Sequence, residues 1–166
     1  MTAKELVLNQ LKMGQVLIGE FTADLSDAEY FQPPLAGANH ATWILGHLAC
    51  TEDWAMSLLG GTVYRIPQKL HDAFKGGSTC DADATKYPGR REIDRLFAEA
   101  RAFTLERLAQ SDLSTWANRS PEGFPANRLP TVASVWSLMG LHQFWHFGQL
   151  TVCRQAMKKG NVFGRG

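Results

Sequence analysis

Residues 131–157 read TVASVWSLMGLHQFWHFGQLTVCRQAM, and this stretch decides which fold the chain is expected to adopt. Thr131 follows Pro130 and is a suitable N-cap, while Lys158, Lys159 and Gly160 suit a carboxyl-terminal end. The stretch therefore predicts a long helix. One stripe at helical spacing consists of Val135, Leu138, Met139, His142, His146, Gln149, Leu150, Cys153 and Met157.

Three further segments carry apolar residues at the same helical period. They span about residues 2–22, 39–59 and 90–110. Asn39 is the expected N-cap of the middle segment, and Gly60-Gly61 is its expected stop. Strand signals are poor, and no internal repeat or domain linker is visible. Four helices of about 20 residues, each about 30 Å long, predict an all-α protein: one four-helix-bundle domain over residues 1–166.

The predicted helices are joined by connections of unequal length. The gap at residues 61–89, about 28 residues, exceeds an ordinary connection between helices. It is expected to be a crossover as long as the bundle, or a partial lid. Its Gly76-Gly77 and Pro88-Gly89 pairs argue against another long helix. Residues 118–130 are rich in Pro, Asn and Gly, which predicts a loop or a short irregular hairpin.

Length and cysteine count argue against a small secreted protein that is held together by disulfides. A chain of 166 residues can bury roughly 70% of its unfolded surface in one core, so it needs no disulfides. Cys50, Cys80 and Cys153 form no Cys-x-x-Cys pair, which fits a reducing cytoplasm. Cys50 and Cys153 are expected to be small core residues rather than nucleophiles.

The net charge of +1 argues against a nucleic-acid partner, because duplex binding usually needs a strongly basic surface. The first residues lack the pattern of a signal peptide, and no run of about 18 apolar residues occurs. We therefore expect a soluble cytoplasmic protein with no nucleic-acid partner and no membrane partner.

Two histidines in the quoted stretch have the spacing of metal ligands. His142 and His146 are four residues apart, which places them about 40° apart around a helix and about 6 Å along it. Two ring nitrogens can then reach one ion at about 2.0 to 2.1 Å. Both interrupt an apolar stripe, and burying a polar group without a partner costs about 1 to 3 kcal/mol. The alternative is that each imidazole hydrogen-bonds a carbonyl or hydroxyl group in the core.

His47 is a third candidate ligand, on the inner edge of the second predicted helix. In helix bundles, a ligand on one helix and an i, i+4 pair on another can converge in the core. Three neutral histidines leave coordination positions free, which is typical of catalytic rather than structural sites. Gly46, Gly140 and Gly148 lie beside these histidines, either for close approach near an ion or for ordinary helix packing.

The pattern Trp43-x-x-Gly46-His47-x-x-x-x-Glu52, with His142-x-x-x-His146-x-Gly148-Gln149, resembles the DinB-like (DinB/YfiT) superfamily of four-helix-bundle metalloproteins. The likeness spans the whole chain, including the long gap before the third helix. It implies that His47, His142 and His146 bind one divalent ion such as nickel or zinc, and that the protein is a homodimer. Some relatives are thiol-dependent S-transferases or isomerases that use low-molecular-weight thiols, while many have no known reaction.

The leading hypothesis is a metal-dependent enzyme in which a metal-bound water or thiol reacts with a small-molecule substrate. No carboxylate general base can be placed, which slightly favours a thiol transferase over a hydrolase. The rival hypothesis is a non-catalytic, metal-binding or structural homodimer, and the third is a metal-free bundle.

Four other polar residues are interpreted more simply. His40 and His71 are expected to face solvent, although His40 could lie at a helix mouth near the pocket and His71 could belong to a lid that contacts substrate. Gln149 could support the ligand His146 or form an interhelical hydrogen bond. Glu52 lies roughly 140° around the helix from His47, so a surface or interface role is expected.

Overall fold

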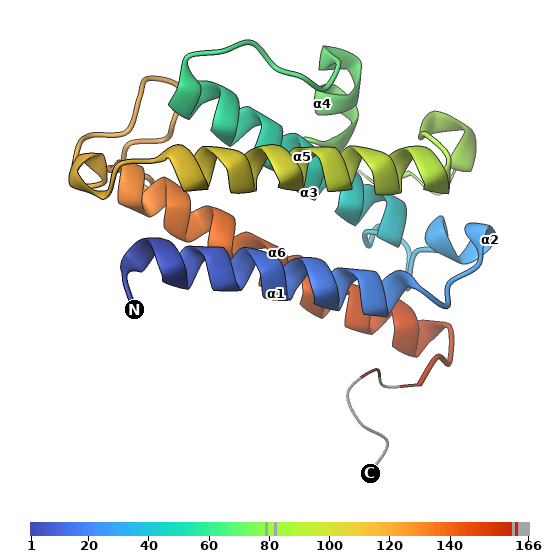
Figure 1. Ribbon diagram of the computed structural model, residues 1–166. Helices are drawn as coiled ribbons and strands as arrows, with labels where there is room; N and C mark the ends of the chain where they lie inside the picture. The colour runs from blue at the N-terminus through green and yellow to red at the C-terminus, as the bar shows by residue number, and fades with distance from the viewer. Residues whose placement is uncertain (79, 82, 161, 163–166) are drawn as a thin grey trace.

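The computed structural model describes residues 1–166 except 79, 82, 161 and 163–166 (Figure 1). The predicted all-α class is confirmed, since the described residues form helices and no strand, apart from one bridge between Arg119 and Thr131. The long helices are α1 (Ala3–Thr22), α3 (Ala41–Gly60), α5 (Arg90–Gln110) and α6 (Val132–Ala156). The short ones are α2 (Asp27–Tyr30), α4 (Gln68–Phe74), η1 (Ala84–Lys86) and η2 (Leu113–Thr115). The long helices match the four predicted segments.

The helix starts follow capping rules, with one correction. Thr131 accepts a hydrogen bond from the Ser134 N–H in a capping box, as its position predicted. The N-cap of α3 is His40 rather than Asn39, because the His40 Nδ1 accepts a hydrogen bond from the Trp43 N–H at 3.0 Å. The prediction that His40 faces solvent is wrong as well. Its ring is fully buried, and its Nε2 lies 3.1 Å from the Asp81 carbonyl oxygen.

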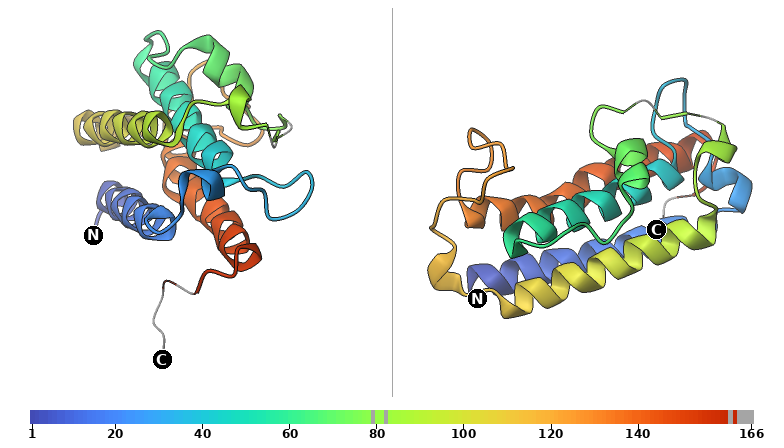
Figure 2. Two further views of the ribbon diagram at one scale, coloured as in Figure 1. Left: turned by 90° about the vertical axis from the view of Figure 1, so that its right-hand side faces the viewer. Right: turned by 90° about the horizontal axis from the view of Figure 1, so that it is seen from above.

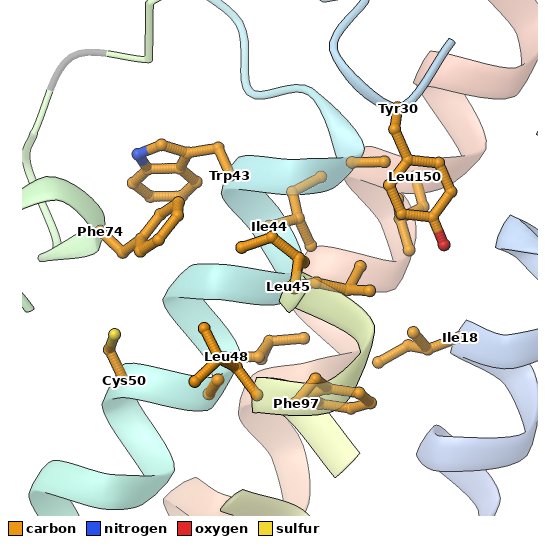
Figure 3. Packing of buried hydrophobic residues seen from close by; sticks show 14 of the residues in the cluster. Ile18, Tyr30, Trp43, Ile44, Leu45, Leu48, Cys50, Phe74, Phe97 and Leu150 are labelled. Carbon is orange, nitrogen blue, oxygen red and sulfur yellow. The ribbon is translucent and has the colours of Figure 1, made fainter. Parts of the chain in front are cut away.

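Helix α3 is the most extensively buried helix of the bundle, and it packs against α5 and α6. The other close pair is α1 with α6, and Figure 2 shows α1 and α5 running nearly parallel beside the inclined α3 and α6. Apolar side chains from all four long helices meet in one cluster. Figure 3 shows part of it, with Ile18 from α1, Leu45 from α3, Phe97 from α5 and Leu150 from α6.

Two glycines permit close contacts between elements. A Cβ atom on Gly46 would lie 2.5 Å from Cε1 of Phe74, so the Phe74 ring rests directly on the α3 backbone. A Cβ on Gly140 would collide with the side-chain amide of Gln10 across the α1–α6 contact. Close approach therefore accounts for these two glycines. At Gly148 a Cβ would meet no heavy atom within 4 Å.

The long connection between α3 and α5 folds onto α3 through α4, a helix of seven residues. This agrees with the prediction that residues 61–89 contain no further long helix. The predicted irregular hairpin at residues 118–130 closes with the Arg119–Thr131 bridge. None of the described helices has the length and apolar character that crossing a membrane requires.

A buried ion pair joins α3 to α5. Arg101 is fully buried, and its Nη2 donates to Oε1 of Glu52 at 2.6 Å while its Nε contacts both carboxylate oxygens at 3.1 Å. Arg101 also donates to the Leu11 carbonyl of α1. The predicted surface or interface role of Glu52 is wrong, since only 4% of Glu52 is exposed. Helix α5 covers the side of α3 that faces away from His47, so both sides of α3 are interior.

Candidate metal centre

Three histidine side chains from α3 and α6 converge in the bundle. Nε2 of His142 lies 3.2 Å from Nε2 of His47 and 3.0 Å from Nε2 of His146. The three ligand atoms all lie within 4.8 Å of one another, so this cluster could hold a metal ion. The three residues that the sequence singled out are therefore brought together by the fold.

Hydrogen bonds at the far ring nitrogens determine which nitrogen carries the proton in two of the rings. Nδ1 of His47 lies 2.6 Å from the Phe74 carbonyl oxygen, and Nδ1 of His146 lies 2.8 Å from Oε1 of Gln149. A carbonyl oxygen can only accept, so both Nδ1 atoms carry hydrogen and both Nε2 atoms present a lone pair. The Gln149 oxygen also accepts a hydrogen bond from the Asn39 side-chain amide at 3.4 Å. Gln149 of α6 therefore both orients His146 and contacts the segment that precedes α3.

The geometry of these nitrogens fits a divalent cation. The lone pairs of His47 and His146 both face Nε2 of His142, which has one hydrogen at most and can satisfy only one of them. An ion at the centre would satisfy all three nitrogens. Tetrahedral bonds of about 2.0 to 2.1 Å place neighbouring ligand nitrogens about 3.3 Å apart. The distances of 3.0 and 3.2 Å are close to that separation.

The surroundings keep these imidazoles neutral, which is the state that binds metal. Burial lowers the pKa of His142 to about 3, and the neighbouring His146 and His47 contribute to that lowering. Burial likewise lowers the pKa of His146 to about 4, against the opposing hydrogen bond to Gln149. The pKa of His47 is also lowered by burial, against the opposing hydrogen bond to the Phe74 carbonyl.

The wall of the site comes from α3 and from the connection that follows it. The Trp43 indole stacks on the His47 ring, with centroids 4.8 Å apart and planes 10° apart. Trp43 Nε1 donates to Oγ of Ser78 at 3.1 Å, which ties the end of the α4 segment over α3. Figure 3 shows the Phe74 ring beside the Trp43 indole. Part of the connection at residues 61–89 therefore positions a candidate ligand.

The chain matches the sequence pattern of the DinB superfamily over residues 10–150. It belongs to the DinB superfamily. The comparison with curated proteins finds no match. Among solved structures, the chain is similar to a conserved protein from Enterococcus faecalis, with a TM-score of 0.79 and 18% identity. That likeness covers 96% of this chain and 99% of the other, and it supports the fold alone.

The sequence of this DinB-superfamily protein does not predict the polar pair of His71 and Asp53. His71 was expected to face solvent or to belong to a lid, but 9% of it is exposed and its Nε2 lies 2.9 Å from Oδ2 of Asp53. Phe74, three residues after His71 and so on the same face of a helix, was the available signal of burial. Asp53 had no comparable signal, since an Asp within a helix is usually solvated.

The cysteines of this DinB-superfamily protein are free thiols, and Cys50 and Cys153 are buried as expected of core residues. Burial raises the pKa of Cys50 to about 12 and that of Cys153 to about 11. Both thiols are therefore protonated near neutral pH and are poor nucleophiles.

Proposed function

We propose that the protein is a metal-dependent enzyme in which His47, His142 and His146 bind one divalent ion. Its reaction would be thiol transfer or hydrolysis on a small-molecule substrate. One observation carries the proposal: two Nε2 lone pairs face a third imidazole nitrogen that can satisfy only one of them. Membership of the DinB superfamily supports it.

Zinc or nickel is the proposed ion, since imidazole nitrogens suit both metals. A bound ion of this kind would supply Lewis acidity toward a water or a low-molecular-weight thiol at its free coordination positions. The residues of the chain have separate tasks. The Phe74 carbonyl and Gln149 orient two of the rings, and Trp43 covers the face of His47.

The composition of the cluster favours thiol transfer over hydrolysis. It consists of three histidines without a carboxylate among the described residues. Hydrolysis benefits from a general base that activates water, whereas a thiol ionises more readily than water and needs less help. We therefore propose a thiol transferase acting in the cytoplasm, where the three free cysteines would stay reduced.

The test compares metal-free protein with protein reloaded with zinc or nickel. Glutathione and cysteine serve as thiols, and 1-chloro-2,4-dinitrobenzene serves as the electrophile. We expect thioether formation above the uncatalysed rate only with the metal-loaded protein. If chelation lowers the melting temperature and no loaded form shows activity in a broader thiol screen, the rival structural role is correct. If tag-free protein binds neither metal, the bundle is metal-free.

We also propose that the protein is a homodimer that associates through the outer sides of α1 and α6. Leu141, Trp145 and Val152 share one stripe of α6 at spacings of four and seven, and all three are exposed. Met13 and Val16 are exposed on α1, which packs beside α6. Exposed apolar groups of this kind on neighbouring helices are typical of protein interfaces.

Trp145→Glu is expected to convert the dimer to a monomer, because 74% of the Trp145 side chain is exposed at the centre of the α6 stripe. A charge there would be desolvated in the interface. Light scattering coupled to size-exclusion chromatography measures the mass. The control is Val63→Glu, an equally drastic change at an apolar residue that is 86% exposed in the connection after α3. A wild-type monomer, or a dimeric Trp145→Glu variant, would contradict the assignment.

A further inference from the structure

A cavity of about 320 Å³ lies on the side of α3 that faces α4. Its volume falls at the lower end of the range of small-molecule sites. Aromatic rings from Trp54, Tyr64 and Phe74 form part of its wall. The other lining residues are Cys50, Thr51, Gln68, His71, Asp72, Lys75 and Gly76.

His71 in this wall is held by a buried carboxylate. Oδ2 of Asp53 lies 2.9 Å from Nε2 of His71 and accepts from the Ile66 N–H at 2.9 Å. Both Asp53 oxygens also accept from the Arg65 N–H at 3.1 Å. Burial raises the pKa of Asp53, but the hydrogen bonds from His71, Ile66 and Arg65 outweigh it and hold the pKa below its usual range. Asp53 is therefore an ionised acceptor near neutral pH.

The partner of Nε2 determines the state of the other ring nitrogen. Because the Asp53 carboxylate accepts, Nε2 of His71 carries a hydrogen, and in the neutral form of the ring Nδ1 has a lone pair. Among the described residues, Nδ1 of His71 has no hydrogen-bond partner. The Tyr64 ring stacks on the imidazole, with centroids 4.5 Å apart, and fixes the plane of the ring. A histidine oriented by a carboxylate, with one nitrogen free in a cavity wall, is the arrangement of a general base.

We propose that this cavity binds a small organic molecule with an acidic O–H or S–H group, which donates its proton to Nδ1 of His71. The O–H or S–H bond breaks, its electron pair stays on the oxygen or sulfur, and the proton forms a new N–H bond. The imidazolium that results stays hydrogen-bonded to the Asp53 carboxylate, which stabilises its charge. Asp53 is a positioning residue, and His71 touches the ligand.

The cavity shares its wall with the histidine cluster. Cys50 lies about one helical turn beyond His47 on α3, and the Phe74 carbonyl that contacts Nδ1 of His47 belongs to a residue of this wall. A Cβ atom on Gly76 would lie 3.8 Å from Cε1 of His47. A ligand activated by His71 would therefore lie next to the candidate metal centre. Binding itself needs no metal ion, so the inference goes beyond the proposed function.

The test uses 4-nitrophenol, whose acidic group is a phenolic O–H and whose phenolate form absorbs visible light. It is carried out at a pH where free 4-nitrophenol is mainly protonated. We expect the wild-type protein to bind it saturably and to increase the phenolate absorbance. His71→Gln keeps an N–H donor for Asp53 but has no basic nitrogen. We expect this variant to lose the absorbance increase and to bind the phenol about 10- to 150-fold more weakly, as for one lost hydrogen bond to a charged group.

Two further variants separate the possible causes. Thr51→Trp fills the cavity and leaves the His71–Asp53 pair intact, so binding is expected to disappear. His142→Ala removes a candidate metal ligand and leaves this cavity intact, so the 4-nitrophenol response is expected to persist, with or without metal. Circular dichroism checks the fold of each variant. Absence of saturable binding to the wild type, or a wild-type response from His71→Gln, would overturn the proposal.

Discussion

His142→Ala is expected to abolish stoichiometric binding of zinc or nickel and to raise the Kd more than about 100-fold, since even loss of a supporting residue costs 10- to 100-fold. His142 is the central member of the cluster, because its Nε2 lies 3.2 Å from Nε2 of His47 and 3.0 Å from Nε2 of His146. Without it, one nitrogen from α3 and one from α6 remain. We expect the same loss for His47→Ala and His146→Ala.

Elemental analysis of tag-free protein and isothermal titration calorimetry measure this effect. Gln149→Ala removes the acceptor of the His146 Nδ1 hydrogen bond and should weaken metal binding by an intermediate 10- to 100-fold. The matched control is His71→Gln, which removes a histidine outside the cluster and should leave metal content unchanged. Unchanged metal content in any one of the three alanine variants would remove that histidine from the proposed site.

Arg101→Met is expected to lower the free energy of unfolding by about 3–5 kcal/mol, the cost of leaving one member of a buried pair without its partner. Arg101 has no exposed surface, and it contacts the Glu52 carboxylate through Nη2 and Nε. Without the guanidinium, the Glu52 charge would lie between α3 and α5 with no cation to compensate it. Urea unfolding monitored by circular dichroism measures the loss.

The double variant Glu52→Leu with Arg101→Met provides the diagnostic comparison. It removes both charges and should be more stable than the single variant Arg101→Met, because apolar replacement of a whole buried pair is often nearly neutral. Arg95→Met is the matched control, since Arg95 forms an exposed pair with Glu99 on α5 and should matter little. Equal losses from Arg95→Met and Arg101→Met would contradict the role of the buried pair.

Most of the helical architecture was predictable because helix periodicity and capping are local properties of the chain. The last helix was expected after Thr131, and α6 does begin at Val132 with Thr131 as its cap. The histidine cluster was predictable for a related reason. His142 and His146 share a helix face by spacing alone, and the motif around His47 matches a known family.

Apart from the N-cap of α3, the errors concern residues whose partners are distant in sequence. His40, expected in solvent, lies against the carbonyl of Asp81, which is 41 residues away. Glu52, expected at a surface, pairs with Arg101, which is 49 residues away. Helical spacing identifies the face on which a residue lies. It does not identify which other element will cover that face.

The sequence by itself determined the four long helices, the Thr131 cap of α6, and the spacing that turns His142 and His146 toward one point. These features depend on backbone hydrogen bonding and on periodic burial within about 20 residues. Only the tertiary structure decided that the Phe74 carbonyl orients His47 and that Asp53 holds His71 in a cavity wall. The connection folds back onto α3 with the Phe74 ring packed on Gly46, and helical periodicity cannot predict a contact between residues so far apart in the sequence.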